Sequence, residues 1–512
     1  MKQSKQSSAL ALLVTAAAAA LCPTGSRAQV STRTWYGYGR GPQHQAQSRV
    51  GGQALASILW QKQIDLSVTS GSGELLIHYG SVMITHQNTV VTPIKTTSAG
   101  DFEVEGLAGA TGATQWTVTS DWVPPPHDWY PVFGPVLAPN GRVYYPGAGG
   151  TVQYRDRADQ PNTAPTGRIA FFGNAAYAAD PTDFNNNVFI NTPLTLDSAG
   201  DLYFGFEVTG TNPANLVSGL ARIAPDGRGS YVSAVTLSGD TSMTKTQDNC
   251  TPAVSLDGRT VYVAVNNTTG TNAWGNGYIC SCDSVTLAPI HHTYLLDPKS
   301  GDAGIVIDDS TASPLIGPDG DVYIGILENP FPENNDRGWL IHLDANLTLK
   351  GAPGAFGWDD TPSIVPSTMV PAYKGTSSYL LMCKYNNYVG IGTGNGDDKI
   401  AVLDPNATET DPVSGWTTMN EVMTDDQQLP SPAGGVHEWC INSAAIDPVT
   451  KAIFANCEDG HIYRWDMTTG TLTQTIGLTS GIGEAYTCTV IGPDGKVYAL
   501  NDAILFACGT AP

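Results

Sequence analysis

Short apolar runs separated by polar, glycine-containing turns make up most of this chain, and one pattern returns at intervals of about sixty residues. Each copy has a short apolar run, an Asp-Gly, Asn-Gly or related turn, and a second run that contains Val-Tyr or Leu-Tyr. Clear copies begin at Gly134, Thr192, Thr251, Ser313 and Thr489, and weaker copies begin near Tyr79, Thr361 and Asn442. Such turns permit positive φ, and β-branched and aromatic runs suit strands. Each copy therefore predicts a β-hairpin.

A second two-strand pattern follows many of these copies. It consists of a strand, an Asp, a turn with Thr-Gly or Ser-Gly, and another strand, as in residues 296–301 and 463–470. Two successive hairpins make a four-stranded antiparallel sheet, and sheets of this size arranged around a channel form a propeller. The predicted fold class is all-β: an eight-bladed β-propeller of four-stranded antiparallel blades. Seven blades is the alternative.

The last copy of the pattern is one strand short. Strands are expected near residues 487–492, 497–500 and 503–507, after which the sequence given stops. Residues 56–62, near the expected mature N-terminus, could supply the missing outer strand. We therefore expect this N-terminal strand to close the ring without a covalent link.

Composition narrows the class of protein further. Lys and Arg number 25 and Asp and Glu number 47, so the formal net charge is 25 − 47 = −22. Hydrophobic residues reach 41%, which is enough for a folded core, and Gly and Pro are frequent. A strongly acidic chain has no charge to offset nucleic-acid phosphates. The negative net charge therefore argues against a nucleic acid, and against an anionic membrane surface, as the partner.

Residues 1–28 have the layout of a signal peptide. Lys2 and Lys5 precede an apolar run over residues 9–21, and Ser26-Arg27-Ala28 offers a small-x-small cleavage site. No other stretch is apolar for long enough to be a transmembrane helix. We expect residues 29–512 to form a single β-propeller domain in a secreted or periplasmic protein.

Eight cysteines follow residue 28, an even number that suggests disulfides in an exported chain. Cys440 begins one arm of a predicted hairpin and Cys457 ends the other, so the two are expected nearly opposite one another. Directly opposed strand residues need only a small adjustment to reach disulfide geometry. We predict a disulfide between Cys440 and Cys457, with two reduced thiols on opposite faces of the hairpin as the alternative.

Two segments carry a resemblance to a known family. Residues 35–44, Trp-Tyr-Gly-Tyr-Gly-Arg-Gly-Pro-Gln-His, with Ser48 and Trp60 after them, resemble the opening of PQQ-like β-propellers, which include quinoprotein alcohol dehydrogenases. Residues 109–116, Gly-Ala-Thr-Gly-Ala-Thr-Gln-Trp, are similar to that family's blade-docking motif. The resemblance implies that Trp116 packs between neighbouring blades. The related dehydrogenases share adjacent cysteines over the cofactor, and this sequence has no Cys-Cys pair and no CxxCH motif. PQQ binding is therefore not expected, and a PQQ-dependent oxidoreductase is kept as an alternative.

In a propeller of this strand order, the segments that lead into each innermost strand share one face with the loops that join the second and third strands. These segments are unusually polar and aromatic here. The candidate ligand-binding residues at this channel mouth are His127, Asp128, Trp129, Asn249, Asp359, Asp360, Lys384, Asn386, His437, Glu438, Trp439, Glu484 and Tyr486. Carboxylate and amide oxygens suit Ca²⁺, and aromatic rings beside polar groups suit sugars. The alternative for each residue is a structural role, in which its side chain caps the end of a strand or bonds to a neighbouring blade.

The predicted function is an exported propeller that binds a carbohydrate, a small molecule or a protein at the channel mouth, with catalysis left open. A polysaccharide lyase acting on uronates is a second enzymatic alternative. For that reaction, His127 or His437 with Tyr486 would transfer protons, and Lys384 would neutralise the substrate carboxylate. The sequence contains no GxSxG, HExxH or phosphate-loop motif, which disfavours hydrolase, zincin and nucleotide-binding readings.

Overall fold

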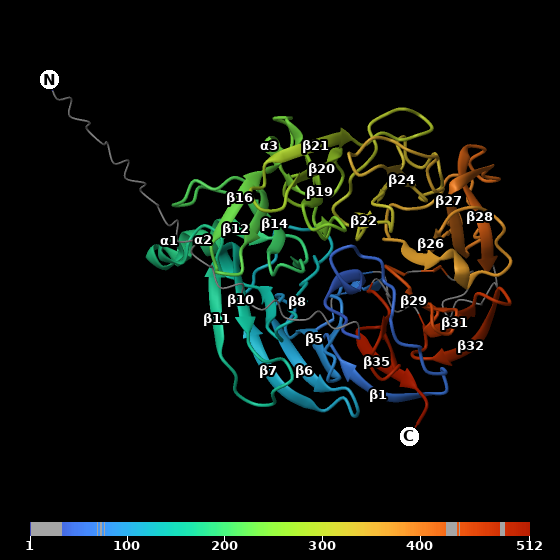
Figure 1. Ribbon diagram of the computed structural model, residues 1–512, viewed down its shortest axis with the longest axis horizontal. Helices are drawn as coiled ribbons and strands as arrows, with labels where there is room; N and C mark the ends of the chain where they lie inside the picture. The colour runs from blue at the N-terminus through green and yellow to red at the C-terminus, as the bar shows by residue number, and fades with distance from the viewer. Residues whose placement is uncertain are drawn as a thin grey trace.

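Eight antiparallel sheets stand in a ring around a central channel (Figure 1). The computed structural model describes the chain except for residues 2–32, 69, 72–73, 76, 426–437, 440, 482–486 and 512. The chain runs once around the ring, so that β1 and β35 lie side by side in Figure 1. The predicted eight-bladed β-propeller is confirmed, and the seven-bladed alternative is wrong.

The first four blades follow one another along the chain. Blade 1 is β4 (Met83–Ile84), β5 (Thr89–Lys95), β6 (Phe102–Ala108) and β7 (Thr114–Ser120). Blade 2 is β8 (Val136–Leu137), β9 (Val143–Pro146), β10 (Thr151–Arg155) and β11 (Thr166–Ala170). In blades 3 and 4 the innermost strand is split in two. Blade 3 is β12 (Val188–Ile190), β13 (Thr195–Leu196), β14 (Leu202–Val208), β15 (Gly219–Ile223) and β16 (Gly229–Ser233). Blade 4 is β17 (Lys245–Thr246), β18 (Ala253–Val254), β19 (Thr260–Asn266), β20 (Gly277–Asp283) and β21 (Pro289–Tyr294).

The remaining four blades complete the ring. Blade 5 is β22 (Leu315–Ile316), β23 (Val322–Ile326) and β24 (Trp339–Leu343), and bridges from Leu340 to Gly354 and from Leu343 to Leu349 put residues 349–354 in the place of a fourth strand. Blade 6 is β25 (Ser363–Pro366), β26 (Tyr379–Lys384), β27 (Ile400–Thr410) and β28 (Thr417–Asp425). Blade 7 is β29 (Ala445–Asp447), β30 (Ala452–Asn456), β31 (His461–Asp466) and β32 (Thr471–Gly477). Blade 8 is β33 (Val490–Ile491), β34 (Val497–Asn501), β35 (Ile504–Gly509) and β1 (Ser57–Gln63).

Helices and a small hairpin fill gaps outside the blades. The α-helices are α1 (Asn174–Ala179), α2 (Pro181–Asn187) and α3 (Ala234–Ser238), the 3₁₀ turns are η1 (Tyr38–Arg40), η2 (Ala148–Gly150) and η3 (Ser367–Met369), and the hairpin is β2 (Ser70–Gly71) with β3 (Glu74–Leu75). Within the described part of the chain, no helix has both the length and the apolar character needed to cross a membrane.

In blades 2, 3, 4, 5 and 8, the tight turn between the first and second strands has a glycine at positive φ. In blade 5, Gly320 of the Asp-Gly turn has φ of 91°, and a Cβ on this residue would meet no neighbouring atom within 4 Å. Space is therefore not the constraint, and the backbone conformation alone favours glycine. The Asp-Gly turns predicted from the repeat are formed for this reason.

The ring closes as predicted. Strand β1 pairs antiparallel with β35, and Ile58 lies opposite Cys508. Trp60 of β1 is buried, and its indole Nε1 donates to the Gly109 carbonyl of blade 1 at 3.0 Å. A single strand therefore completes blade 8 and also binds blade 1. Trp116 packs in the same manner between blades 1 and 2, donating to the Ala158 carbonyl at 2.7 Å, as the family resemblance implied.

Residues 35–53 form a second closure, which the sequence did not predict. This closing segment, residues 35–53, lies across the ends of the innermost strands, on the face of the Asp-Gly turns. Its carbonyl oxygens accept from the second residue of an innermost strand in blades 1, 2, 4, 5, 6 and 7, and its Gln53 N–H donates to the Gly495 carbonyl of blade 8. The six donors are Ile84, Leu137, Val254, Ile316, Ile364 and Ile446. The segment therefore closes one end of the channel.

Glutamine side chains repeat along the closing segment in the same way. The Nε2 atoms of Gln43, Gln45 and Gln47 donate to the carbonyls of Val254, Ile316 and Ile364 at 3.0, 2.9 and 3.0 Å. In each of these blades, a backbone N–H thus donates to a carbonyl of the closing segment, and a backbone carbonyl accepts from a glutamine side-chain amide of that segment. In blades 4, 5 and 6 the innermost strand is therefore bonded to the closing segment through both a backbone N–H and a carbonyl.

All seven cysteines of the described part of the chain are buried free thiols: Cys250, Cys280, Cys282, Cys383, Cys457, Cys488 and Cys508. The Cys457 thiol donates to the Glu438 carbonyl at 3.2 Å. Cys440 lies outside the described residues. The Cys440–Cys457 disulfide therefore stays a prediction.

Candidate functional site

A cavity of about 410 Å³ opens at the channel mouth, on the face opposite the closing segment. It is lined by segments that lead into innermost strands and by loops that join second and third strands, as expected for this face. The lining residues are His78, Trp129, Trp274, Ile307, Asp309, Asp336, Trp358, Asp359, Tyr388, Val389, Ile391, Glu438 and Glu458. Blades 1, 2 and 4 to 7 all contribute. We refer to it as the mouth cavity.

Aromatic rings form much of its wall. The ring of buried His78 stacks on Trp129 with centroids 5.4 Å apart and an angle of 25° between the planes. Burial, helped by the Lys384 charge, lowers the pKa of His78 to about 3, so this imidazole is neutral at physiological pH. Trp358 is fixed by its indole Nε1, which donates to the Asp336 carbonyl at 2.6 Å.

Five carboxyl groups share this wall: Asp309, Asp336, Asp359, Glu438 and Glu458. Burial raises the pKa of Asp309 to about 7, helped by the nearby Asp128, Asp308 and Asp359 charges. Burial likewise raises the pKa of Asp336 to about 7, with Glu328 and Asp359 adding to the shift and Lys384 opposing it. The crowding of negative charge in a poorly solvated space makes ionisation of these groups costly.

Lys384 lies beneath the cavity, between two carboxylates. Its Nζ is 2.8 Å from Asp359 Oδ2, and both side chains are almost fully buried. Its backbone N–H donates to Asp360 Oδ2 at 3.2 Å. Burial raises the pKa of Asp360 to about 8, an effect that Lys384 reduces and Asp359 increases. The lysine predicted to neutralise a substrate carboxylate is therefore already committed to protein carboxylates.

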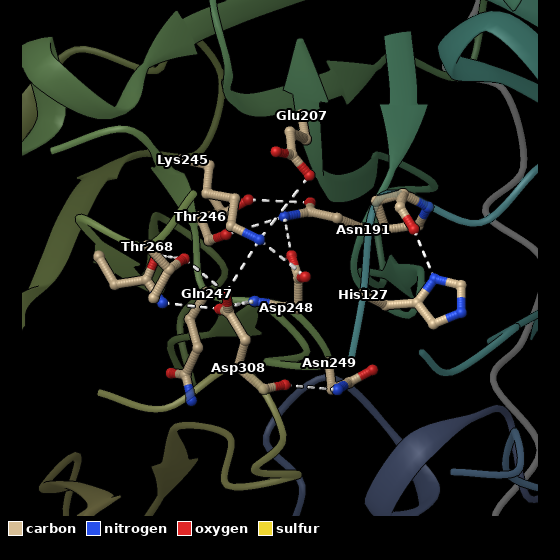
Figure 2. A network of polar contacts seen from close by, with 12 residues as sticks. His127, Asn191, Glu207, Lys245, Thr246, Gln247, Asp248, Asn249, Thr268 and Asp308 are labelled. Atoms are coloured by element: carbon tan, nitrogen blue, oxygen red, sulfur yellow. Dashed lines mark hydrogen bonds and ion pairs between the residues drawn. The ribbon is translucent and has the colours of Figure 1, made fainter. Parts of the chain in front are cut away.

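A second ionic cluster lies behind the cavity in blades 3 to 5 (Figure 2). Lys245 Nζ is 2.7 Å from Asp248, 3.0 Å from Asp308 and 3.7 Å from Glu207, and all four side chains are at least nine-tenths buried. Thr268 donates to Asp308 at 2.5 Å. Burial and mutual repulsion raise the pKa values of Asp248 and Glu207, and Lys245 opposes both shifts. Three carboxyl groups thus surround one ammonium, and the cluster joins three blades.

Asn249 connects neighbouring blades. Its Nδ2 donates to the Asp308 carbonyl, and its Oδ1 accepts from the Val132 N–H, both at 2.8 Å. His127 is half-buried, and its Nδ1 is 2.6 Å from the Pro125 carbonyl. Asp128 is exposed at the rim. These three residues lie around a narrow cleft beside the mouth cavity, which they share with Trp129 and Asp309.

The other ten predicted site residues fall into three groups. Trp129, Asp359 and Glu438 line the mouth cavity. Asp360, Lys384, Asn386 and Trp439 are buried next to it, where Asn386 Oδ1 accepts from the Trp439 N–H at 3.2 Å. His437, Glu484 and Tyr486 lie outside the described residues. The proton-transfer group proposed for a lyase therefore stays a prediction for His437 and Tyr486.

Several lining residues were not among the predicted ones: His78, Trp274, Asp336, Tyr388 and Glu458. All but His78 come from loops between second and third strands, which vary in length from blade to blade and carry no repeat. In the structure, Trp274 is 48% exposed and Val389 is 64% exposed. In the sequence, the signal available was a large aromatic residue, Trp274, within a long polar loop.

Comparisons with known proteins identify the fold. Neither the protein-family models nor the curated sequences give a match. Among solved structures, a europium-containing methanol dehydrogenase matches with a TM-score of 0.55 and 12% identity over 92% of this chain and 89% of that chain. A quinohemoprotein alcohol dehydrogenase from Comamonas testosteroni matches with a TM-score of 0.56 and 12% identity over 95% of this chain and 82% of that chain. The chain has the PQQ-like β-propeller fold, and at this identity the likeness extends to the fold alone.

The described lining of the mouth cavity does not fit PQQ, the cofactor that the family resemblance implied. PQQ carries three carboxylates, so its site needs cations or many N–H donors. The described lining supplies five carboxyl groups and neither Lys nor Arg, and the nearest lysine, Lys384, is paired with Asp359. Nor do three acidic, His or Cys side chains of the described residues converge in a geometry that would hold a metal ion.

Proposed function

We propose that this protein is an exported propeller whose mouth cavity binds an organic ligand. The observation that carries the proposal is the cavity itself: about 410 Å³, walled by Trp129, Trp358 and Tyr388 beside polar groups. Ligand sites in proteins are commonly concave, aromatic and of roughly 300–1,000 Å³. Of the three partner classes expected, a small molecule, or one side chain of a larger partner, suits this volume best.

The closing segment supports a binding role. Residues 35–53 cover the other end of the channel, and the mouth cavity opens on the face opposite to them. A ligand that enters the cavity loses part of its water, which strengthens its polar contacts. The PQQ-dependent oxidoreductase gains no support, because the carboxyl groups of the described lining would repel an anionic cofactor. The uronate lyase gains none either, because Lys384 is already paired with Asp359.

Export is part of the proposal and rests on residues 1–28 alone. Amino-terminal sequencing of the protein recovered from its native host tests it. Mature protein that begins at Gln29 is expected, and protein that retains residues 1–28 would contradict export.

The ligand proposal is tested by thermal-shift screening of metabolites that include sugars, alcohols, amines and carboxylic acids. A true ligand raises the melting temperature in a dose-dependent manner. We expect Trp358→Ala and Trp129→Ala to abolish the shift while each variant keeps a cooperative melting transition. Trp416→Ala is the matched control, because Trp416 is exposed and does not line the cavity. A shift in melting temperature that persists in both cavity variants would overturn the proposal. A screen in which no compound shifts the melting temperature would also overturn it.

A further inference from the structure

The charge of the lining has one sign. Asp309, Asp336, Asp359, Glu438 and Glu458 contribute carboxyl groups, and among the described lining residues there is no lysine or arginine. Lys384 offsets part of this charge from below, but its side chain is fully buried against Asp359. A bound anion would be repelled here, and a neutral sugar would leave the excess charge uncompensated.

The aromatic rings of the cavity provide an independent observation. Trp129, Trp274, Trp358 and Tyr388 line the same space as the carboxyl groups. The faces of Trp and Tyr attract cations within about 6 Å of the ring centre, and several such rings around one cation form an aromatic cage. Rings with carboxylates at their edges suit a positively charged group that also has apolar surface.

The rim of the cavity extends the apolar surface. Trp274 is 48% exposed, and its ring meets that of Phe331, 40% exposed, edge to face at 5.4 Å. Both residues belong to loops of blades 4 and 5 that rise beside the opening, and the exposed Val389 of blade 6 continues this edge. The apolar part of a ligand would lie against the rim while its charged part enters the cavity.

We propose that the ligand of the mouth cavity is an organic cation with an apolar body. The class comprises amines and quaternary ammonium groups, presented either by a small molecule or by a basic side chain of a peptide. This inference rests on the proposed function and adds the chemical class of the ligand. Burial, with a smaller contribution from neighbouring carboxylates, raises the pKa values of Asp309 and Asp336, and a bound cation would favour their charged forms.

Isothermal titration calorimetry with matched probes tests the charge requirement. The probes are 2-phenylethylamine, choline and Nα-acetyl-lysine amide as cations, 2-phenylethanol as the neutral counterpart and 3-phenylpropanoate as the anion. We expect 2-phenylethylamine to bind at least tenfold more tightly than 2-phenylethanol, and 3-phenylpropanoate not to bind. The ranking of Nα-acetyl-lysine amide against the two small amines shows which source of the cation the cavity prefers.

Asp336→Asn and Asp257→Asn form a matched pair of variants. Both replace a carboxyl group by an amide, but Asp257 is exposed in a turn and does not line the cavity. The Asp336 hydrogen bonds to Trp358 and Glu328 use its backbone carbonyl and N–H, so Asp336→Asn retains them. We expect Asp336→Asn to weaken 2-phenylethylamine binding at least fivefold and Asp257→Asn to change it less than twofold.

The outcomes separate this inference from the proposed function. Equal affinity for 2-phenylethylamine and 2-phenylethanol, lost in Trp358→Ala, would overturn the cation inference and leave the binding function intact. Failure of every cationic probe would also overturn the inference, whereas the metabolite screen decides the binding function separately. Equal effects of Asp336→Asn and Asp257→Asn would show that only overall charge matters, which contradicts a built site.

Discussion

Asp360 shows how burial sets the behaviour of a single carboxyl group. Its Oδ2 accepts the Lys384 N–H, whereas its Oδ1 has no hydrogen-bond partner among the described residues. Burial, reinforced by Asp359, raises its pKa from the ordinary 3.8 to about 8. The folded state therefore holds a proton that the unfolded state releases above pH 4. The resulting stability is complete below the unfolded pKa and is lost as the pH rises through 8.

Asp360→Asn should remove this pH dependence, because an amide does not titrate. Relative to the unmodified protein, the free energy of unfolding of Asp360→Asn should increase by up to about 1.4 kcal/mol per pH unit between pH 5 and pH 8, and then level off. Urea denaturation at pH 5, 6, 7 and 8 measures it. A difference between the two proteins that stays constant with pH would show that Asp360 is already ionised in the folded state.

Lys245 is the one cation in contact with Glu207, Asp248 and Asp308 in the described structure. Lys245→Met would leave these buried carboxyl groups without a counter-charge, and we expect the free energy of unfolding to fall by about 3–5 kcal/mol. Lys350→Met is the control, since Lys350 is 41% exposed beside Asp321 and its loss should cost less than about 1 kcal/mol. Equal losses in urea denaturation would contradict the difference in burial.

The sequence predicted which face some site residues share, but not how their side chains pair. Asp359 and Lys384 were expected on one face, and they do meet, as an ion pair rather than as two groups open to a ligand. Side-chain direction depends on packing that a strand pattern does not encode. Asp336 and Tyr388 were missed because their loops lie outside the repeat that identified the blades.

At the scale of elements, the strand that completes blade 8 could be predicted because the repeat left that blade one strand short. The blade boundaries followed from Asp-Gly turns, whose chemistry is local. The contacts of Gln43, Gln45 and Gln47 could not be predicted, since each pairs with a carbonyl more than two hundred positions away. Residues 35–53 do not belong to the repeat, so the repeat itself does not indicate which blades they contact.

Ile58→Cys tests the pairing of β1 with β35. The new thiol would lie opposite the natural thiol of Cys508, within reach of a disulfide after modest adjustment. Oxidation would close a loop of 508 − 58 = 450 residues and raise the free energy of unfolding by about 2–4 kcal/mol. The gain is measured by urea denaturation with and without reductant.

Ile58→Ser is the control for the loss of the isoleucine side chain, and its stability should not respond to reductant. Peptide mapping under non-reducing conditions identifies the linked residues. Cross-linking of the new cysteine to any residue other than Cys508, or its recovery as a free thiol after oxidation, would contradict the register of β1 and β35.

At the scale of the whole molecule, Tyr38 connects the closing segment to three blades. Its hydroxyl lies 2.5 Å from Asn442 Oδ1, 2.7 Å from Thr361 Oγ1 and 3.1 Å from the Thr311 carbonyl. These partners precede the innermost strands of blades 5, 6 and 7. The hydroxyl therefore lies where the blades converge, and the side chain is buried.

Tyr38→Phe should lower the free energy of unfolding by about 1–3 kcal/mol, because buried polar atoms at the centre of the ring lose a partner. Tyr231→Phe removes the same hydroxyl from a side chain that is 40% exposed, and it should be nearly neutral. Urea denaturation compares the two variants. A loss for Tyr38→Phe no larger than that for Tyr231→Phe would show that the closing segment is not anchored through this hydroxyl.

The closing segment also bears on how the chain is made. During synthesis residues 35–53 leave the ribosome before any blade, yet the side chain of Gln53 bonds to the carbonyl of Asp494, 441 positions later. Early blades can form as the nascent chain lengthens, but the segment finds its last partners only when translation is nearly finished. A prematurely terminated polypeptide would leave the segment without its partners in the missing blades. Complete coverage of this end of the channel therefore depends on synthesis of the last blade.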